Sequence, residues 1–444
     1  MFERIIDVPE QNLRFHILNT DKFKMSRLSL SFVFDADARI SPLVKLMMAV
    51  IMRGSEDYPE ISDINRRLDE LYGATVSYRA TSVGGRHIFK ISCDMLSNKY
   101  RLDGDEVDVT RGVVELILGI LFAPLKNSEG LLSEKYSESE KKLAIDAIKA
   151  RINDQRAYAA DKCKKAMLSD HVSAISVDGS CELLSSFGIS EITDIHRYFL
   201  ENSVVEFYYV GSDDVSSANE MIKQAFSNVP RATKRINTEE MAFVQCRSEV
   251  NELNEELESV SQGRLNIGCA CGTVMKDRDY HAMSMFNEML GGTSVSKLFM
   301  NVREKKSLCY YCYSSYNSAN GTIMIGCGIE PKNKKRAMAE IKRQIDAMKM
   351  GNFTDDELLC AKRAILSGLK QIYDSPHAVE AFKFRRLLAG VEESVDECAM
   401  SIESVSRDDV ISAANKVKID TVYFLSGKTI SGENNYAGEE SDYE

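Results

Sequence analysis

The chain is poor in histidine, and its few histidines are scattered. Among its 444 residues there are six: His16, His87, His171, His196, His281 and His377. No two of them lie within five residues of each other. A zinc ion held on one helix needs ligands at positions i and i+4, so that both side chains face the same side. The sequence therefore excludes a zinc centre built from two histidines on a single helix.

Long apolar runs are also missing, and so is a targeting segment. The longest apolar runs, 46–52 and 116–123, are too short to span a bilayer. Residues 1–7 lack the basic start and apolar core of a signal peptide. The 11 cysteines form an odd-numbered, scattered set that fits a reducing compartment. We therefore expect a cytoplasmic chain with no membrane partner.

Positive charge is in short supply. The sequence has 56 Lys and Arg against 67 Asp and Glu, which gives a formal net charge of −11. A domain that binds nucleic acid carries a basic patch or stripe, so this balance argues against nucleic acid as a partner. It is compatible with a peptide partner of basic character, although ordinary solubility explains most of the charge equally simply.

The chain consists of two similar halves. The first half carries strand patterns at 14–18, 28–34, 76–82, 87–93 and 206–211, and helix patterns at 43–53, 61–72, 105–125, 131–170 and 180–200. The second half carries strand patterns at 265–269, 309–316, 322–329 and 420–427, and helix patterns at 280–290, 295–305 and 333–350. A capping box at 354–357 opens a further helix. This alternation predicts an α+β fold with antiparallel sheets packed by helices.

The closing strands of the two halves end at Gly211 and Gly427, about 216 residues apart. This spacing is too long for a solenoid unit and indicates a duplicated domain. We therefore predict an N-terminal domain at 1–228, a linker at 229–258 and a C-terminal domain at 259–428. The linker is expected to hold a strand near 242–250. The tail 429–444 is acidic and lacks a core pattern, so we expect it to be disordered.

The most specific motif lies at 291–310, with the sequence GGTSVSKLFMNVREKKSLCY. Its Gly-Gly-Thr start could suggest phosphate binding, but a Walker loop requires Gly-Lys-Ser/Thr, and Lys297 does not follow a glycine. The two glycines are better explained as a helix stop. Arg303 and Tyr310 then fall at a helix end and a strand start, where both can donate hydrogen bonds to a substrate carbonyl.

This stretch resembles the C-terminal signature of the M16 (insulinase-like, pitrilysin) zinc peptidases. In that signature a glycine-rich turn leads into a short helix, then an Arg, then a Tyr seven residues later. The resemblance implies that Arg303 and Tyr310 bind substrate, with Gly291, Gly292 and Thr293 as their motif context. It also implies a fold of two homologous halves, a LuxS/metallohydrolase-like duplication, closing around a chamber. The chain length resembles that of the M16B branch, in which two such chains pair.

The zinc motif of that family, His-x-x-Glu-His, is missing. The segment 43–55 ends in Arg-Gly-Ser, which is similar to the Lys-Gly-Thr that follows the family's zinc helix. This alignment places the two His positions at Lys45 and Ala49 and the catalytic Glu at Met48. The third ligand falls, less securely, at Ala147. No catalytic or metal-binding residue is therefore expected in this chain, since nothing would acidify a bound water or take its proton.

Three smaller patterns have simpler explanations. Lys45 can be a snorkelling lysine at the start of an apolar helix. Cys309 and Cys312, like Cys269 and Cys271, could bind zinc, but residues i and i+3 of a strand point to opposite faces, which favours buried thiols. Tyr158 and Lys162 lie one helical turn apart and could line a chamber, although a solvated helix face is the expected arrangement.

Three functional hypotheses remain. The first is a non-catalytic subunit of a two-chain M16B peptidase, in which a zinc-bearing paralogue supplies the metal and this chain supplies Arg303 and Tyr310 for a peptide substrate. The second is a structural or peptide-binding pseudoenzyme, for which this pair would be dispensable. The third is an enzyme of another class, but no Ser, Cys or Lys stands in a nucleophile–base signature.

Overall fold

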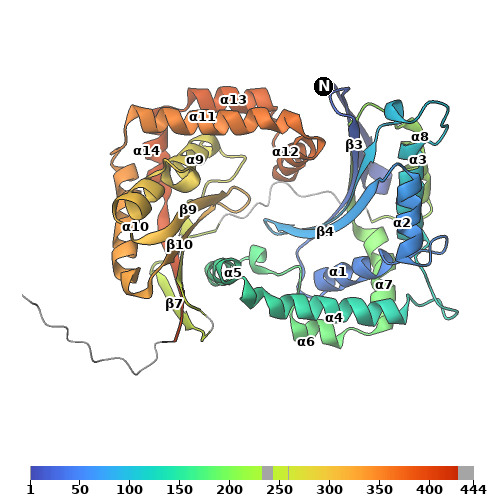
Figure 1. The fold of residues 1–444 in the computed structure, drawn as a ribbon, viewed down its shortest axis with the longest axis horizontal. Helices are drawn as coiled ribbons and strands as arrows, with labels where there is room; N and C mark the ends of the chain where they lie inside the picture. Colours follow the sequence, from blue (N-terminus) through green and yellow to red (C-terminus); the bar gives the residue numbers. More distant parts are fainter. Residues whose placement is uncertain (1, 233–243, 259, 429–444) are drawn as a thin grey trace, which may run out of the picture.

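The computed structural model describes residues 2–232, 244–258 and 260–428. The chain forms two halves, each with a mixed sheet covered by helices, and the halves lie side by side (Figure 1). The predicted disordered tail at 429–444 and the part of the predicted linker at 233–243 lie outside the described residues.

The N-terminal sheet has six strands in the order β1-β2-β6-β3-β5-β4. Their bounds are β1 Phe2–Val8, β2 Leu13–Asn19, β3 Met25–Asp35, β4 Thr75–Val83, β5 Arg86–Leu96 and β6 Val204–Gly211. The helices of this half are α1 Ile40–Ile51, α2 Ile61–Glu70, α3 Val109–Phe122, α4 Glu134–Ala150, α5 Gln155–Met167, α6 Cys181–Ser186, α7 Ile189–Asn202 and α8 Ser216–Ser227. Alternate residues of β3, Leu28, Leu30 and Phe32, face the main helical core, because successive side chains of a strand point to opposite faces.

The C-terminal sheet has five strands in the order β7-β11-β8-β10-β9. Their bounds are β7 Asn251–Glu256, β8 Gly263–Ala270, β9 Cys309–Asn317, β10 Thr322–Ile329 and β11 Lys418–Ser426. The helices are α9 Tyr280–Asn287, the π-helical turns η5 Glu288–Gly292 and η6 Phe299–Lys305, α10 Lys334–Lys349, α11 Asp355–Gln371, α12 Pro376–Ala389, α13 Val395–Ser404 and α14 Arg407–Lys416.

The two sheets repeat one topology. Strands β2-β6-β3-β5-β4 of the first sheet correspond in order to β7-β11-β8-β10-β9 of the second, and β1 is an addition. The pairs β2–β6 and β7–β11 are both parallel, whereas the other neighbours are antiparallel. The predicted α+β fold with two similar halves is confirmed.

The structure adds elements to the predicted pattern. Strand β1 and helices α8, α12, α13 and α14 have no counterpart in it. Residues 244–250 do not form the strand expected there. The strand that opens the C-terminal sheet is β7, which lies inside the range 229–258 assigned to the linker.

Each half covers the open face of the other half's sheet with one helix (Figure 1). Helix α5 of the N-terminal half packs on β8 and β11, where Ala159 and Cys163 contact Tyr423 and Leu425. Helix α12 of the C-terminal half packs on β3 and β6 through an apolar cluster. The buried members of that cluster are Leu18, Val33, Ile88, Tyr208, Val210, Val379, Phe384 and Leu388. The two halves are therefore joined by buried apolar surface on both sides.

A buried carboxylate strengthens the joint at α12. Glu380 accepts hydrogen bonds from Arg27 Nε at 2.5 Å, Ser29 Oγ at 2.6 Å and Lys90 Nζ at 2.6 Å. Burial opposes its ionisation most strongly, but the charges of Lys90 and Arg27 outweigh it and hold the pKa of Glu380 below its ordinary value. Helix α12 is thus fixed to the N-terminal sheet by an ion-pair network.

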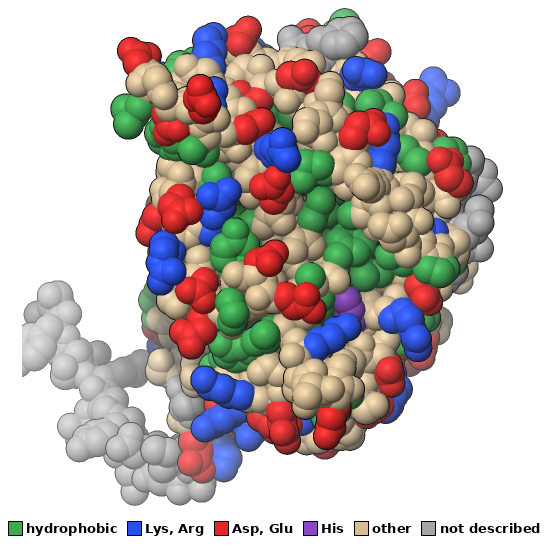
Figure 2. Space-filling model, turned by 90° about the vertical axis from the view of Figure 1, so that its right-hand side faces the viewer, with side chains coloured by type: hydrophobic (Ala, Val, Ile, Leu, Met, Phe, Trp, Pro, Cys, Tyr) green, Lys and Arg blue, Asp and Glu red, His purple; other side chains and the backbone are tan. Residues whose placement is uncertain are grey.

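The outer surface of the N-terminal half shows no block of one charge. On the side that carries α2, α3 and α8, acidic and basic side chains are interspersed, with hydrophobic side chains gathered near the middle (Figure 2). Across the described residues, none of the helices combines the length and the hydropathy that a membrane crossing requires.

Candidate functional site

Lys45 lies on α1 and is held by Asp178, an acidic residue that lines a cavity. Its Nζ donates a hydrogen bond to Asp178, and Arg151 donates to the other carboxylate oxygen of Asp178. Burial opposes the ionisation of Asp178, but the hydrogen bond from Lys45 and the charges of Lys45 and Arg151 hold its pKa below the ordinary value. The Lys45 ammonium is a charged donor without a free lone pair, so it cannot bind a metal ion.

The other positions of the predicted lost zinc site offer no ligands either. Met48 is fully buried in the main core. Ala49, one residue later on α1, has no donor atom. Ala147 is exposed on α4, and it is its neighbour Ile148 that lines the cavity. The residues present do not fit zinc, because a tetrahedral site needs three or four N, O or S ligands directed at one point.

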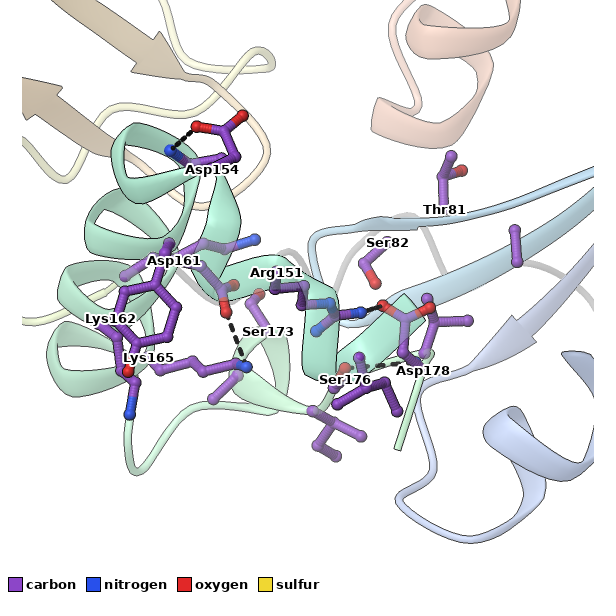
Figure 3. A pocket seen from close by; sticks show the side chains of 18 residues that line it. Thr81, Ser82, Arg151, Asp154, Asp161, Lys162, Lys165, Ser173, Ser176 and Asp178 are labelled. Carbon is purple, nitrogen blue, oxygen red and sulfur yellow. Dashed lines mark hydrogen bonds and ion pairs between the residues drawn. The ribbon is translucent and has the colours of Figure 1, made fainter. Parts of the chain in front are cut away.

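The cavity has a volume of about 630 Å³ and opens between β4, the end of α4, α5 and residues 173–178 (Figure 3). Four basic side chains line it, namely Arg151, Lys162, Lys164 and Lys165. Three acidic side chains accompany them, namely Asp154, Asp161 and Asp178. Two of these carboxylates are in ion pairs within the wall, Asp161 with Lys165 and Asp178 with Arg151 (Figure 3).

Tyr158 and Lys162 both line this cavity, and Lys162 is also exposed to solvent. Tyr158 donates a hydrogen bond to Glu255 of β7 at 2.8 Å, which ties α5 to the C-terminal sheet. Because α5 lies close to that sheet, one face of α5 forms part of the cavity wall. The sequence of α5 alone does not indicate this contact.

Arg303 and Tyr310 lie on either side of a tight turn. Arg303 belongs to η6, and its guanidinium lies over the ring of Phe299 at 4.6 Å and 3.6 Å from Glu304. The chain reverses at Ser307, whose φ is 48°, and its N–H donates to the Arg303 carbonyl at 2.9 Å. Tyr310 follows at the start of β9. The turn therefore presents both side chains at one end of β9.

Both side chains are available to a ligand. The side chain of Arg303 is 40% exposed, and Tyr310 is 52% exposed. Within the described part of the chain, the Tyr310 hydroxyl has no hydrogen-bond partner. Neither residue lines the 630 Å³ cavity. The structure thus places the Arg/Tyr pair at the C-terminal sheet edge and the Lys45 position in the N-terminal half, as two separate sites.

Gly291 has a packing role that explains its place in the motif. A Cβ at this position would lie 2.4 Å from the backbone nitrogen of Ser314 in β9. The π turn η5 runs through Gly292, and the extended conformation begins at Thr293, so the helix stops slightly later than predicted. Thr293 then accepts a hydrogen bond from Ser296 Oγ at 2.6 Å. The glycines thus allow η5 to press against β9 and set the position of η6.

Comparisons with known proteins agree with this architecture. A family model described as "Peptidase M16 inactive domain" matches residues 186–365. The probable inactive metalloprotease YmfF of Bacillus subtilis is 30% identical over 420 residues, which are 93% of this chain and 95% of that protein. The chain belongs to the M16 peptidase family.

Solved structures support the M16 fold across the whole chain. A conserved protein from Enterococcus faecalis V583 superposes with a TM-score of 0.88 at 22% identity, covering 98% of this chain and 100% of that one. A peptidase M16 inactive domain from Pseudomonas fluorescens superposes with a TM-score of 0.75 at 16% identity, covering 97% and 99%. The chain is an inactive M16 protein.

One prediction about the cysteines of this M16 protein is wrong. Cys309 and Cys312 were expected on opposite faces of their strand. The ladder between β9 and β10 pairs Cys309 with Ile329 and Tyr311 with Gly328, so Tyr310 is an extra residue in a β-bulge. Because Tyr310 is left out of the ladder, Cys309 and Cys312 lie on the same face of the sheet, against the same core.

A second group was not anticipated from the sequence. His281, Glu393 and Cys398 place ligand-type atoms within 4.8 Å of one another. However, Arg386 donates to Glu393 at 3.0 Å, and His281 Nε2 lies 2.8 Å from the same carboxylate. A cation already neutralises this carboxylate, so we interpret the group as an ion-pair network that joins α9, α12 and α13.

Proposed function

We propose that this chain is the non-catalytic, substrate-binding subunit of a two-chain M16 zinc peptidase that processes peptides inside a closed chamber. A zinc-bearing M16 paralogue is the proposed partner and holds the metal. This chain contributes Arg303 and Tyr310. Nucleic acid and membrane have no part in the proposal.

The observation that carries the proposal is that Arg303 and Tyr310 are available to a ligand, whereas the positions aligned with the family's zinc motif hold no ligand. Arg303 and Tyr310 are substantially exposed, and the Tyr310 hydroxyl is unbonded within the described residues. If they served only the fold, the hydroxyl and guanidinium would be expected to hold neighbouring elements together, as Tyr158 and Arg27 do. π-helical turns such as η6, which carries Arg303, are frequent at functional sites.

The geometry suggests how a peptide would be held. Strands β4 and β9 are edge strands of the two sheets, and an extended peptide can add to such an edge through main-chain hydrogen bonds. Arg303 would bind a backbone carbonyl of the peptide. Tyr310 would donate its hydroxyl hydrogen to the carbonyl oxygen of the scissile bond, where negative charge develops in the transition state. The zinc of the partner would supply the activated water.

The alternative is a structural or peptide-binding pseudoenzyme with no role in proteolysis. The packing of α5 and of α12 against the sheet of the opposite half favours this alternative, because it joins the two halves firmly. The two proposals differ in one respect, since only the first requires the Arg303 guanidinium and the Tyr310 hydroxyl.

Reconstitution tests the proposal. The chain is mixed with a zinc-bearing M16 paralogue from the same organism, and hydrolysis of a peptide library is measured for each chain alone and for the mixture. We expect stable association and activity in the mixture only, with inhibition by chelators. Stable association without any gain in hydrolysis would instead support the pseudoenzyme, and hydrolysis by this chain alone would overturn both.

A further inference from the structure

Three cysteines converge where β9 and β10 meet. Cys312 of β9 and Cys327 of β10 are directly opposite each other in the antiparallel ladder. Because of the bulge at Tyr310, Cys309 lies opposite Ile329, the same-face neighbour of Cys327. All three side chains belong to the core on the helical side of the C-terminal sheet. Residues i and i+3 of a regular strand lie on opposite faces, but the bulge puts Cys309 and Cys312 on the same face, together with Cys327 of the next strand.

The three thiols differ in access. Cys309 is partly exposed at the end of the strand, whereas Cys312 and Cys327 are 4% and 1% exposed. The register of β9 and β10 places all three side chains near one another on one face of the sheet. None is in a disulfide. An oxidant from solution would therefore reach Cys309 first, with two buried thiols on the same face of the sheet behind it.

The surroundings favour the thiolate at Cys309. The neighbouring Cys312 and Cys327 thiols, with a smaller contribution from the nearby Arg303 charge, lower the pKa of Cys309 despite its partial burial. The same contact with Cys309 raises the pKa of Cys312 and of Cys327, so these two stay protonated. A thiolate is the reactive form of cysteine, and thiols at its side are poised to resolve an oxidised product.

The geometry also admits a disulfide. Residues directly opposite each other in an antiparallel ladder have Cα atoms about 4.5–5.5 Å apart. Disulfides span Cα separations of roughly 4.4–6.8 Å. The Cys312–Cys327 position is compatible with this range, and Cys309 lies on the same face, diagonal to Cys327 across the ladder. A bond from Cys309 to Cys327 requires the strand end at Cys309 to move closer, because diagonal neighbours in a ladder are about 7–8 Å apart.

We propose that Cys309, Cys312 and Cys327 form an oxidation site for hydroperoxides, in which Cys309 reacts first and one of the two buried thiols resolves it to a disulfide. The Cys309 sulfur attacks the peroxide, the O–O bond breaks, and a sulfenic acid and one molecule of water or alcohol result. The neighbouring thiol then attacks the sulfenic sulfur. An S–S bond forms, the S–OH bond breaks, and the thiol proton leaves with the hydroxyl as water. Two thiols are oxidised and one peroxide is reduced.

This proposal stands apart from the proposed peptidase role, because it concerns only thiols of this chain. Hydrogen peroxide is the probe. The full-length chain is treated at neutral pH, free thiols are alkylated at intervals, and peptide mass spectrometry identifies the oxidised residues. We expect one disulfide that joins two members of the trio, with Cys309 consumed at least about ten times as fast as the exposed Cys360.

Matched variants make the test decisive. Cys309→Ser should prevent disulfide formation in the trio, whereas Cys360→Ser should leave it unchanged. Circular dichroism confirms that each variant is folded. A disulfide that forms at the same rate in Cys309→Ser would overturn the proposal. So would oxidation of Cys309 to sulfinic acid while Cys312 and Cys327 both remain free, or a rate at Cys309 no greater than that at Cys360.

Discussion

Lys45 forms an ion pair with Asp178, and Lys45 stands at the position where the M16 alignment places a zinc ligand. Arg151 binds the second oxygen of the same carboxylate. Two cationic side chains thus bind one carboxylate here. An M16 metal centre would instead need several ligands around one metal cation. These two positive charges support the first prediction.

The purified chain should contain no stoichiometric zinc. Lys45, Met48 and Ala49 offer no ligand set, and the positive charges of Lys45 and Arg151 would repel a divalent ion. Metal analysis of the purified chain by mass spectrometry checks this. The triple substitution Lys45→His, Met48→Glu and Ala49→His should not restore binding, because Arg151 remains and a third ligand is missing. One tightly bound zinc ion at these positions would show that the alignment is wrong.

Removing the Tyr310 hydroxyl should cripple a reconstituted enzyme. Tyr310→Phe deletes one oxygen and keeps the ring, and loss of one such transition-state donor costs about 10²–10³ in turnover, roughly 2.7–4 kcal/mol. Arg303→Ala should lower activity as well. Steady-state kinetics of the two-chain mixture measures both, with association measured separately.

Two other exposed residues serve as controls for these variants. Tyr100→Phe makes the same chemical change at another exposed tyrosine, and Lys305→Ala removes a positive charge from the same π turn as Arg303. Both should leave turnover nearly unchanged. Equal turnover in wild type, Tyr310→Phe and Arg303→Ala would favour the structural pseudoenzyme.

Local sequence patterns predicted most of the fold but not the contacts between its halves. Strand β3 and helix α1 were recognisable because their apolar residues follow the period of a strand and of a buried helix. The bulge at Tyr310 was not, because it depends on the register with β10, a property of two strands together. The cavity wall at Tyr158 was missed for a similar reason, since α5 packs against a sheet from the other half of the chain.

Glu380→Gln should loosen the joint between the halves. The substitution leaves Arg27 and Lys90 without their shared carboxylate, and breaking a buried ion pair costs about 3–5 kcal/mol. The free energy of unfolding, measured by urea denaturation at pH 7, should fall accordingly. Glu392→Gln, at an exposed position, should have little effect.

The effect of Glu380 should depend on pH. The folded-state pKa of this carboxyl is depressed, so its contribution to stability is present above the ordinary glutamate value of 4.5 and is lost as the pH falls through the folded-state value. The difference in unfolding free energy between wild type and Glu380→Gln should therefore shrink on acidification. A difference that stays constant from pH 7 down to the acid transition would contradict the assigned charge of Glu380.

Gly291→Ala should destabilise the Arg303/Tyr310 segment through a steric clash. The new methyl group would lie 2.4 Å from the Ser314 nitrogen, and backbone cannot yield as a flexible side chain can. Overpacking of this kind costs about 1–3 kcal/mol. Because η5 would be pushed away from β9, hydrogen exchange should become faster at the amides of β9 and η6, and turnover of the reconstituted enzyme should fall.

Gly368→Ala is the matched control for Gly291→Ala. Gly368 lies within α11, is exposed, and has no atom within 4 Å of an added Cβ. Alanine is a better helix former than glycine, so this change should raise the free energy of unfolding by about 0.5–1 kcal/mol. Urea denaturation of the two variants should give shifts of opposite sign. If Gly291→Ala were as stable as wild type, with unchanged exchange in β9, the close contact between η5 and β9 would not be what positions the Arg303/Tyr310 pair.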